Sequence, residues 1–234
     1  MNSDSSVVSV STTEQHSEKK QKGSKMRNPV LNWGAFAFCR MLSGVLPSLF
    51  IAVLLFLSMR SVAQETLTFR EMKYDKIIHA AAAKHGVDPM LVKAIIFTES
   101  TFVPSKVGKD GEIGLMQIRT IAATDWANAK GVQLPSKTEM HSPELNIEIG
   151  TWYITRALKR WYSNPDFLRM ALAEYNAGRT RLLEWMADCN QDTDLLMANK
   201  PVGRYADKVC KKYVEYVILN EKADEKKKVK TASN

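Results

Sequence analysis

The chain of 234 residues has room for one medium domain and an accessory segment, and its 45% hydrophobic content excludes a wholly disordered protein. Its formal net charge of +8 predicts an anionic partner, and nucleic acid, membrane lipid and bacterial wall polymer all meet that condition. The three cysteines form no CxxC pair and no Cys/His cluster, so the sequence predicts no metal site.

The N-terminal region divides into a polar tail and an apolar segment. Residues 1–28 are rich in Ser, Thr and Lys, and we expect a disordered basic tail on the cytoplasmic side of the membrane. Residues 29–63 are apolar, and their uncharged stretch 41–59 has the length to cross a bilayer. Small residues around Ala63 permit cleavage by a signal peptidase.

Two interpretations of residues 29–63 stay open. We favour a signal peptide cleaved after Ala63, although the region before it is far longer than an ordinary signal peptide. An uncleaved signal anchor, or translation that starts at Met26, would explain that length. Each interpretation places the rest of the chain outside the cytoplasmic membrane.

The remainder is predicted to be a helical domain over residues 70–220, followed by a basic tail at residues 221–234. Gly86 is a typical helix stop, and Asp88-Pro89 is typical of an N-cap followed by proline at the first helical position. We find no convincing strand pattern, although residues 108–114 could hold a small hairpin. The expected fold class is therefore all-α. The predicted helices cover residues 74–85, 89–100, a segment that starts at Thr120, 143–161, 165–178 and 204–220.

Glu99 occupies an unusual position on the helix predicted at residues 89–100. Val92, Ile95 and Ile96 form an apolar stripe, and Glu99 is the next residue on that stripe. In the last turn of a helix, desolvation and the negative end of the helix dipole both raise the pKa of a carboxyl group, as a general acid at neutral pH requires. Because helices often end an apolar stripe with a polar residue, this pattern alone favours a structural role for Glu99.

Three short motifs change that balance. They are Glu-Ser at residues 99–100, Gly-Leu-Met-Gln at residues 114–117 and Ala-Glu-Tyr-Asn at residues 173–176. In these motifs the chain resembles the lysozyme-like lytic transglycosylases of the soluble type, which carry the SLT domain. The resemblance extends from about Tyr74 to Tyr216 and includes the asparagine-to-glycine stretch at residues 146–150.

The resemblance implies a mostly helical α+β fold of the lysozyme superfamily, with a glycan groove in a compact domain. It also implies cleavage of the peptidoglycan bond between N-acetylmuramic acid and N-acetylglucosamine, with formation of a 1,6-anhydro ring. Glu99 matches the single catalytic acid and base, and Tyr175 matches a tyrosine whose hydroxyl contacts the catalytic carboxylate. No metal and no cofactor are implied. The residues that match substrate-binding positions are Ser100, Met116, Gln117, Tyr175, Asn176 and Tyr205.

The chain departs from the family pattern at several positions. Gly108 stands where members commonly have serine, and Glu112 and Glu174 stand where alanine is usual. The segment at residues 202–204 lacks the acidic residue expected before Tyr205. These departures leave Glu99 in place but bear on the rate and the substrate preference.

Two other functions therefore remain as alternatives. A muramidase on the same fold would use a second carboxylate across the groove, and the candidates are Asp110, Glu112 and Glu174. A non-catalytic module that binds glycan or acts as a scaffold would need no intact acid.

The expected partner is the glycan strand of peptidoglycan. We expect no nucleic acid, because the basic residues do not alternate with aromatic ones and the domain is exported. We expect a monomer in the periplasm or elsewhere outside the cytoplasm, either secreted or anchored in the inner membrane, and association with an envelope complex stays open. A disulfide between Cys189 and Cys210 is compatible with export, and the sequence does not decide whether it forms.

Overall fold

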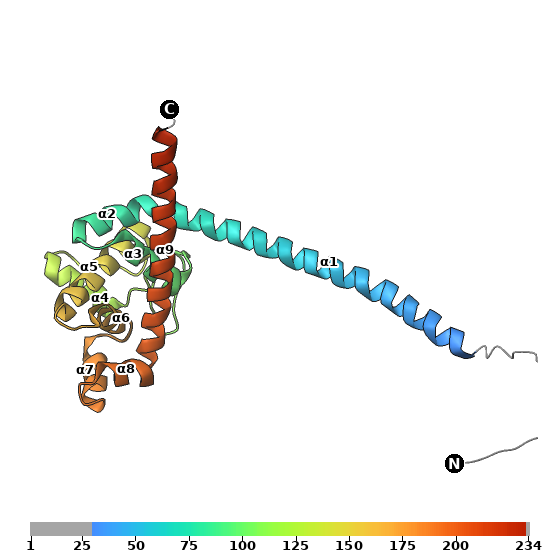
Figure 1. Ribbon diagram of the computed structural model, residues 1–234. Helices are drawn as coiled ribbons and strands as arrows, with labels where there is room; N and C mark the ends of the chain where they lie inside the picture. The colour runs from blue at the N-terminus through green and yellow to red at the C-terminus, as the bar shows by residue number, and fades with distance from the viewer. Residues whose placement is uncertain (1–29, 233–234) are drawn as a thin grey trace, which may run out of the picture. The chain divides into compact units, whose positions relative to one another are not determined.

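The computed structural model describes the backbone of residues 30–232 and the side chains of residues 48–231. The predicted N-terminal tail, residues 1–28, lies outside the described residues. The chain divides into two compact units, Met1–Leu57 and Ser58–Asn234. Helix α1 (Val30–Lys73) crosses the division between them (Figure 1).

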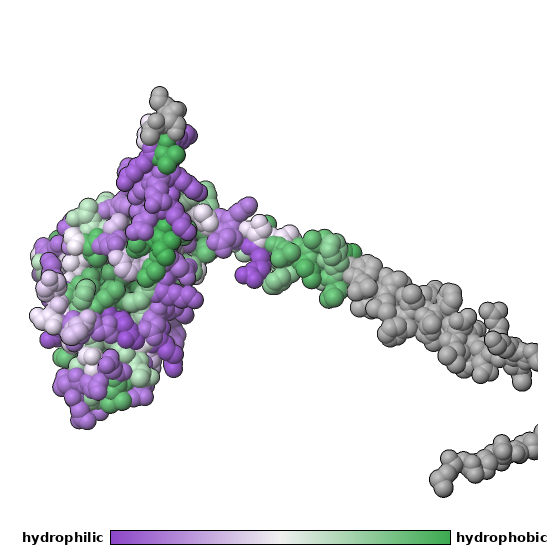
Figure 2. All heavy atoms as spheres, viewed as in Figure 1, coloured by the Kyte–Doolittle hydropathy of each residue, from purple (hydrophilic) through white to green (hydrophobic). Residues whose placement is uncertain are grey.

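Helix α1 contains the apolar segment that the sequence predicts. Its stretch Ser48–Lys73 is long and apolar enough to cross a membrane, by length and composition alone. Figure 2 shows a hydrophobic band on this part of α1. The helix continues without a break past Ala63, so the backbone itself marks no boundary at the predicted cleavage position.

The unit Ser58–Asn234 is helical, and its described residues contain no strand longer than an isolated bridge. The expected caps are present. Gly86 ends α2 in a left-handed conformation, and the Asp88 side chain accepts a hydrogen bond from the backbone N–H of Met90 at 2.8 Å. After α1 the helices are α2 (Asp75–His85), α3 (Pro89–Ser100), α4 (Thr120–Lys130), α5 (Pro143–Trp161), α6 (Phe167–Ala177), α7 (Arg179–Asp188), α8 (Thr193–Asn199) and α9 (Pro201–Ala232), with a 3-10 turn at Glu139–His141.

Helix α3 runs through the main core. It packs against α9 and α2, while α6 packs against both α5 and α9. Val92, Ile95 and Ile96 of α3 are fully buried, and each such side chain stabilises the fold by about 1.5–3 kcal/mol. The predicted apolar stripe therefore anchors α3, and it fixes the position of the residue that ends the stripe, Glu99.

The predicted hairpin at residues 108–114 is present in a minimal form. Isolated antiparallel bridges join Val107 to Ile113 and Ile113 to Ile118. The backbone N–H of Gly108 donates to the carbonyl of Glu112 at 2.8 Å, which closes the turn. This turn lies next to the end of α3 along the chain, and it carries two of the positions that depart from the family pattern.

Helices α7 and α8 lie outside the predicted elements. They pack with α6 and the start of α9 around a second, smaller hydrophobic cluster. Cys189 is buried in this cluster, whereas Cys210 packs against the main core, and both cysteines are free. The disulfide that export would permit is therefore absent from the structure, because the two side chains belong to different clusters.

Helix α9 is longer than predicted at both ends. The sequence predicts a helix over residues 204–220 and a basic tail after it, but α9 begins at Pro201 and continues to Ala232. Lys, Glu and Ala are strong helix formers, so this segment is helical without an apolar stripe to pack. Figure 1 shows these last turns extending beyond the neighbouring helices of the unit, and Figure 2 shows them as mostly hydrophilic.

Candidate active site

Glu99 lies half-buried in the last turn of α3. Burial raises the pKa of its carboxyl group from 4.5 to about 7. The hydrogen bond from Tyr205 and the positive charge of Lys106 act in the opposite direction, and the negative charge of Glu112 adds to the increase. The predicted direction of the shift is confirmed, with desolvation as its largest cause. A carboxyl group with this pKa can hold a proton at neutral pH and donate it.

The carboxyl group of Glu99 is oriented by Tyr205. The Tyr205 hydroxyl donates a hydrogen bond to Glu99 Oε1 at 2.6 Å, and no second hydrogen bond to this carboxyl group is found among the described residues. Tyr205 lies on α9, which packs directly on α3, so the packing of the two helices sets this contact.

No hydrogen bond between Tyr175 and Glu99 is found among the described residues, although both line the smaller pocket. The Tyr175 hydroxyl donates instead to the backbone carbonyl of Met116 at 2.8 Å. Burial raises the pKa of Tyr175, and the nearby charge of Glu99 contributes to the same increase. Both tyrosines therefore lie near Glu99. Tyr175 donates its hydrogen bond to the carbonyl of Met116, and Tyr205 donates its hydrogen bond to the carboxyl group of Glu99.

The loop that carries Gln117 is held by Asn146, a fully buried residue of α5. The Asn146 side chain accepts a hydrogen bond from the backbone N–H of Met116 at 2.7 Å. It also donates to the carbonyls of Ile113 and Met140, each at 2.8 Å. One amide side chain thus fixes three backbone groups, and this explains an asparagine to which the sequence motifs assign no role.

Two glycines allow the same loop to approach α5 closely. A Cβ atom on Gly114 would lie 2.8 Å from Cγ of Asn146, and one on Gly150 would lie 2.8 Å from Cβ of Met116. Gly114 also has φ +82°, which favours glycine. Gln117 is held at φ +49°, an uncommon conformation for a residue with a side chain. The loop is therefore held tightly where it borders Glu99.

Two residues predicted to bind substrate lie in the core instead. Ser100 is 2% exposed, and its hydroxyl donates to the carbonyl of Ile96 at 3.2 Å within α3. Met116 is fully buried in the space that Gly150 leaves open. Consecutive side chains on a helix point about 100° apart, so Ser100 faces the core while Glu99 faces the groove. Neither Ser100 nor Met116 lines the groove, and the prediction for both is corrected.

Glu99 borders two adjoining pockets of about 160 Å³ and about 650 Å³, which together we call the groove. Both pockets are lined by Glu99, Glu112, Gln117 and Asn176. The structure thus brings Gln117, Tyr175, Asn176 and Tyr205 together at Glu99, and their contacts with a sugar stay a prediction.

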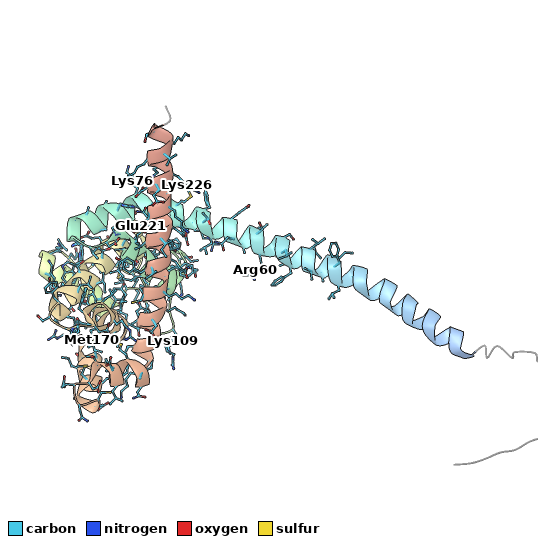
Figure 3. All side chains as sticks on the ribbon, viewed as in Figure 1. Arg60, Lys76, Lys109, Met170, Glu221 and Lys226 are labelled. Carbon is cyan, nitrogen blue, oxygen red and sulfur yellow. The ribbon has the colours of Figure 1, made fainter. Side chains whose placement is uncertain are left out.

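The two ends of the groove differ in character. Tyr153 and Tyr175 line the smaller pocket, with their rings in an edge-to-face arrangement 6.0 Å apart. The larger pocket is basic, and Figure 3 labels one of its cations, Lys109, next to the start of α9. The cationic side chains that line the larger pocket are Lys106, Lys109, Arg204 and Lys208.

Only one of the three candidates for a second carboxylate lines the groove. Glu112 borders both pockets together with Glu99. Glu174 is 2% exposed and pairs with Arg160 and with the indole N–H of Trp161, away from Glu99. Asp110 is exposed and is absent from the residues that line either pocket. Within the described part of the chain, no group of three or more His, Cys, Asp or Glu side chains could hold a metal ion.

Two residues of the site belong to none of the three sequence motifs. The ammonium group of Lys106 donates to the backbone carbonyl of Glu99, and no local pattern marks this lysine. Tyr153 follows Asn146 by seven positions, so the two lie on the same face of α5. That spacing is the one signal that could have placed Tyr153 near the loop of Gln117.

The unit is mostly helical and holds a protonatable carboxyl group, Glu99, in a groove, as expected for the lysozyme-like class of fold. The transglycosylase SLT domain family matches residues 76–195, which is half of the chain, and the chain belongs to this family. The predicted family and fold class are confirmed.

This chain matches only part of the length of its curated relatives. The membrane-bound lytic murein transglycosylase E of Buchnera aphidicola is 35% identical over 116 residues, which cover 47% of this chain and 52% of that protein. The membrane-bound lytic murein transglycosylase C of Pectobacterium atrosepticum is 35% identical over 121 residues, which cover 49% and 34%. The chain thus spans about half the length of the first relative and less of the second.

Two solved structures have a similar fold. The lytic transglycosylase Slt of Pseudomonas aeruginosa matches with a TM-score of 0.55 and 25% identity over 64% of this chain and 25% of that chain. The 70 kDa soluble lytic transglycosylase of Escherichia coli matches with a TM-score of 0.54 and 24% identity over 62% and 24%. The second likeness bears on the fold alone.

Proposed function

We propose that this chain is a peptidoglycan lytic transglycosylase in which Glu99 is the only acid and base. The observation that carries the proposal is the carboxyl group of Glu99, which has a pKa of about 7 and is held at Oε1 by Tyr205 on the wall of a groove. Membership of the SLT domain family and the names of the relatives support the same activity.

In the proposed reaction, protonated Glu99 gives its proton to the oxygen of the bond between N-acetylmuramic acid and N-acetylglucosamine. The bond between that oxygen and the anomeric carbon breaks, and the electron pair goes to the leaving sugar. The anomeric carbon becomes an oxocarbenium ion or is bridged by the N-acetyl group of the muramyl residue. Since Tyr205 occupies Oε1, Oε2 is the oxygen from which the proton leaves.

The second half of the reaction uses the same carboxylate as a base. The C6 hydroxyl of the muramyl residue attacks the anomeric carbon, its proton returns to Glu99, and a 1,6-anhydro ring closes. Water is not a reactant, so the reaction needs no further base. Gln117 and Asn176 line both pockets, and we assign to them the hydrogen bonds that position the sugars. The hydrogen bond from Tyr175 to the carbonyl of Met116 keeps the wall of the smaller pocket in place.

The charge of the groove suits peptidoglycan. Four cationic side chains line the larger pocket, and no ion-pair partner is found among the described residues for any of them. The peptide stems of peptidoglycan carry free carboxylates, which such cations attract. Peptidoglycan is a sufficient anionic partner for this positive charge, and we propose no nucleic acid as a partner.

We also propose that the catalytic domain lies on the outer side of the cytoplasmic membrane. The apolar stretch of α1 and the membrane-bound relatives support attachment to a membrane. The domain boundaries that we propose are residues 29–63 for the signal peptide or anchor and residues 70–220 for the transglycosylase domain. The periplasm is where such a domain would meet its substrate.

The experiment is a digest of purified peptidoglycan by the chain in detergent, with Glu99→Gln in parallel and with the products analysed by mass. Products with 1,6-anhydro ends that disappear with Glu99→Gln are the expected result. Products with reducing ends would instead support the muramidase alternative. If both proteins bind peptidoglycan and neither cuts it, the chain is a binding or scaffolding module and the proposed activity fails.

A further inference from the structure

The carboxylate of Glu112 occupies the space beside Gly108. A Cβ atom on Gly108 would collide with Glu112 Oε2, and it would lie 2.9 Å from Gln117 Oε1 and 3.1 Å from Cβ of Glu112. The two nearest atoms are the ends of flexible side chains, so a side chain at position 108 would push the Glu112 carboxylate aside. The present position of the Glu112 carboxylate therefore depends on the absence of a side chain at Gly108.

Glu112 is held in place by the turn it belongs to. The backbone N–H of Asp110 donates to Glu112 Oε2 at 3.0 Å, and the backbone N–H of Gly108 donates to the Glu112 carbonyl at 2.8 Å. No ion pair with Glu112 is found within the described residues. Glu112 is half-buried, and the hydrogen bond from Asp110 orients its carboxylate where it lines the groove.

This carboxylate and the proposed acid line the same groove. Glu112 and Glu99 line both pockets together, one from the hairpin turn and the other from the end of α3. Their charges interact, because Glu112 contributes to the raised pKa of Glu99. A sugar bound in these pockets would therefore lie near both the proton donor and a carboxylate.

We propose that Glu112 is a second functional carboxylate of the groove, which stabilises the positive charge at the anomeric carbon after Glu99 gives up its proton. This inference rests on the proposed function, since it requires a glycosidic bond to break at Glu99. Glu112 forms no bond with the sugar and takes no proton in this role. It acts as a fixed anion, in a space that a serine at position 108 would otherwise fill.

The geometry separates Glu112 from the other acidic residues. Glu174 is neutralised by Arg160 in the core, and Asp110 is exposed outside the groove lining. Asp110→Asn is therefore a matched control, because it removes a neighbouring carboxylate and keeps the backbone N–H that holds Glu112.

The test compares the full chain in detergent with Glu112→Gln on purified peptidoglycan. Glutamine keeps the size of the side chain, and its amide oxygen can still accept from Asp110. We expect kcat to fall about 10- to 100-fold, with KM little changed, because the lost interaction strengthens in the transition state. We also expect the alkaline limb of the pH profile to move to lower pH, since removal of a negative neighbour lowers the pKa of Glu99.

A second pair of variants tests the shared space. Gly108→Ser should displace the Glu112 carboxylate from its hydrogen bond with the backbone N–H of Asp110, and we expect kcat to fall about as much as it does for Glu112→Gln. Adding Glu112→Ala to Gly108→Ser should lower kcat no further, because the serine has already displaced the carboxylate. Independent, additive effects of the two substitutions would contradict the shared space.

The outcomes are distinguishable from failure of the proposed function. If the unchanged chain does not cut peptidoglycan, the proposed function and this inference fall together. If the unchanged chain cuts, and Glu112→Gln cuts at the same rate with the same pH profile as Asp110→Asn, this inference alone is overturned. A loss of rate with an unmoved alkaline limb would also overturn it, because Glu112 would then not act through charge near Glu99.

Discussion

Glu99→Gln should stabilise the fold at neutral pH while it removes the proposed activity. Burial raises the pKa of Glu99 to about 7, so the folded protein binds a proton that the unfolded chain, with a pKa near 4.5, has already released. Between these two values the free energy of unfolding must fall as the pH rises. Glutamine carries no charge at any pH, and its amide oxygen can still accept the hydrogen bond from Tyr205.

The size of the effect follows from the shift. One pKa unit corresponds to about 1.4 kcal/mol, so a shift from 4.5 to about 7 corresponds to roughly 3 kcal/mol of unfolding free energy. The Glu99 side chain keeps some contact with solvent in the groove, so we expect about 2–3 kcal/mol. For a domain of this size, that difference raises the melting temperature by about 5–10 °C.

The assay is urea unfolding of residues 64–234, with and without the substitution, followed by circular dichroism at pH 4 and pH 8.5. At pH 4 the wild-type carboxyl group is protonated in both states and the two proteins should differ little. At pH 8.5 the glutamine variant should be the more stable one by the amount given above. Equal differences at both pH values, or a less stable variant at pH 8.5, would refute the argument that burial of this carboxyl group carries the shift. Glu225→Gln, an exposed change on α9, serves as the control.

Three further substitutions test separate parts of the site. Tyr205→Phe removes the hydrogen bond that lowers the pKa of Glu99, so the alkaline limb of kcat/KM should move to higher pH by about one unit, and a shift to lower pH would contradict the geometry. Gly203→Ala places a Cβ atom onto the backbone carbonyl of Met197, and we expect a loss of about 2–3 kcal/mol in urea unfolding, whereas an unchanged midpoint would show that α8 can move away. Asn146→Ala leaves three buried backbone groups without partners, so it should lower the free energy of unfolding by about 3 kcal/mol or more and slow cleavage. A stable variant with full activity would show that the loop does not depend on this side chain.

Local signals predicted most helix boundaries in the first part of the domain. Gly86 and Asp88-Pro89 mark the junction of α2 and α3 correctly, because a left-handed stop and a side-chain cap are determined by two or three neighbouring residues. Pro143 likewise opens α5 where the sequence predicts it. These features do not depend on what the helix later packs against.

The helices near the C-terminus were harder to predict for physical reasons. The stripe of α7 is narrow, since only Leu182 and Met186 are buried, and three polar residues at its start hide it. The last turns of α9 bury no apolar side chain, so periodicity gives no signal there, and only the helix propensity of Lys, Glu and Ala indicates a helix.

The site shows the same division between local and long-range information. The apolar stripe of α3 predicts the burial and the raised pKa of Glu99 from twelve residues alone. Which tyrosine would reach the carboxyl group depends on the packing of α3 against α9 and on the competing carbonyl of Met116, and no sequence pattern contains either fact. Tyr175 and Tyr205 could be matched to the site, but their hydrogen bonds could not be assigned.

The departures from the family pattern differ in what they can affect. Glu174 is paired in the core, and Gly203 is required by the close approach of α8 to α9, so neither changes the surface that a glycan would meet. Gly108 and Glu112 differ from these, because together they replace one polar group on the groove wall by a carboxylate that interacts with Glu99. Arg204, in the other departing segment, also lines the larger pocket. If this chain differs from its family in rate or in substrate preference, the difference should therefore come from this turn and from Arg204, and exchange of these residues should transfer it.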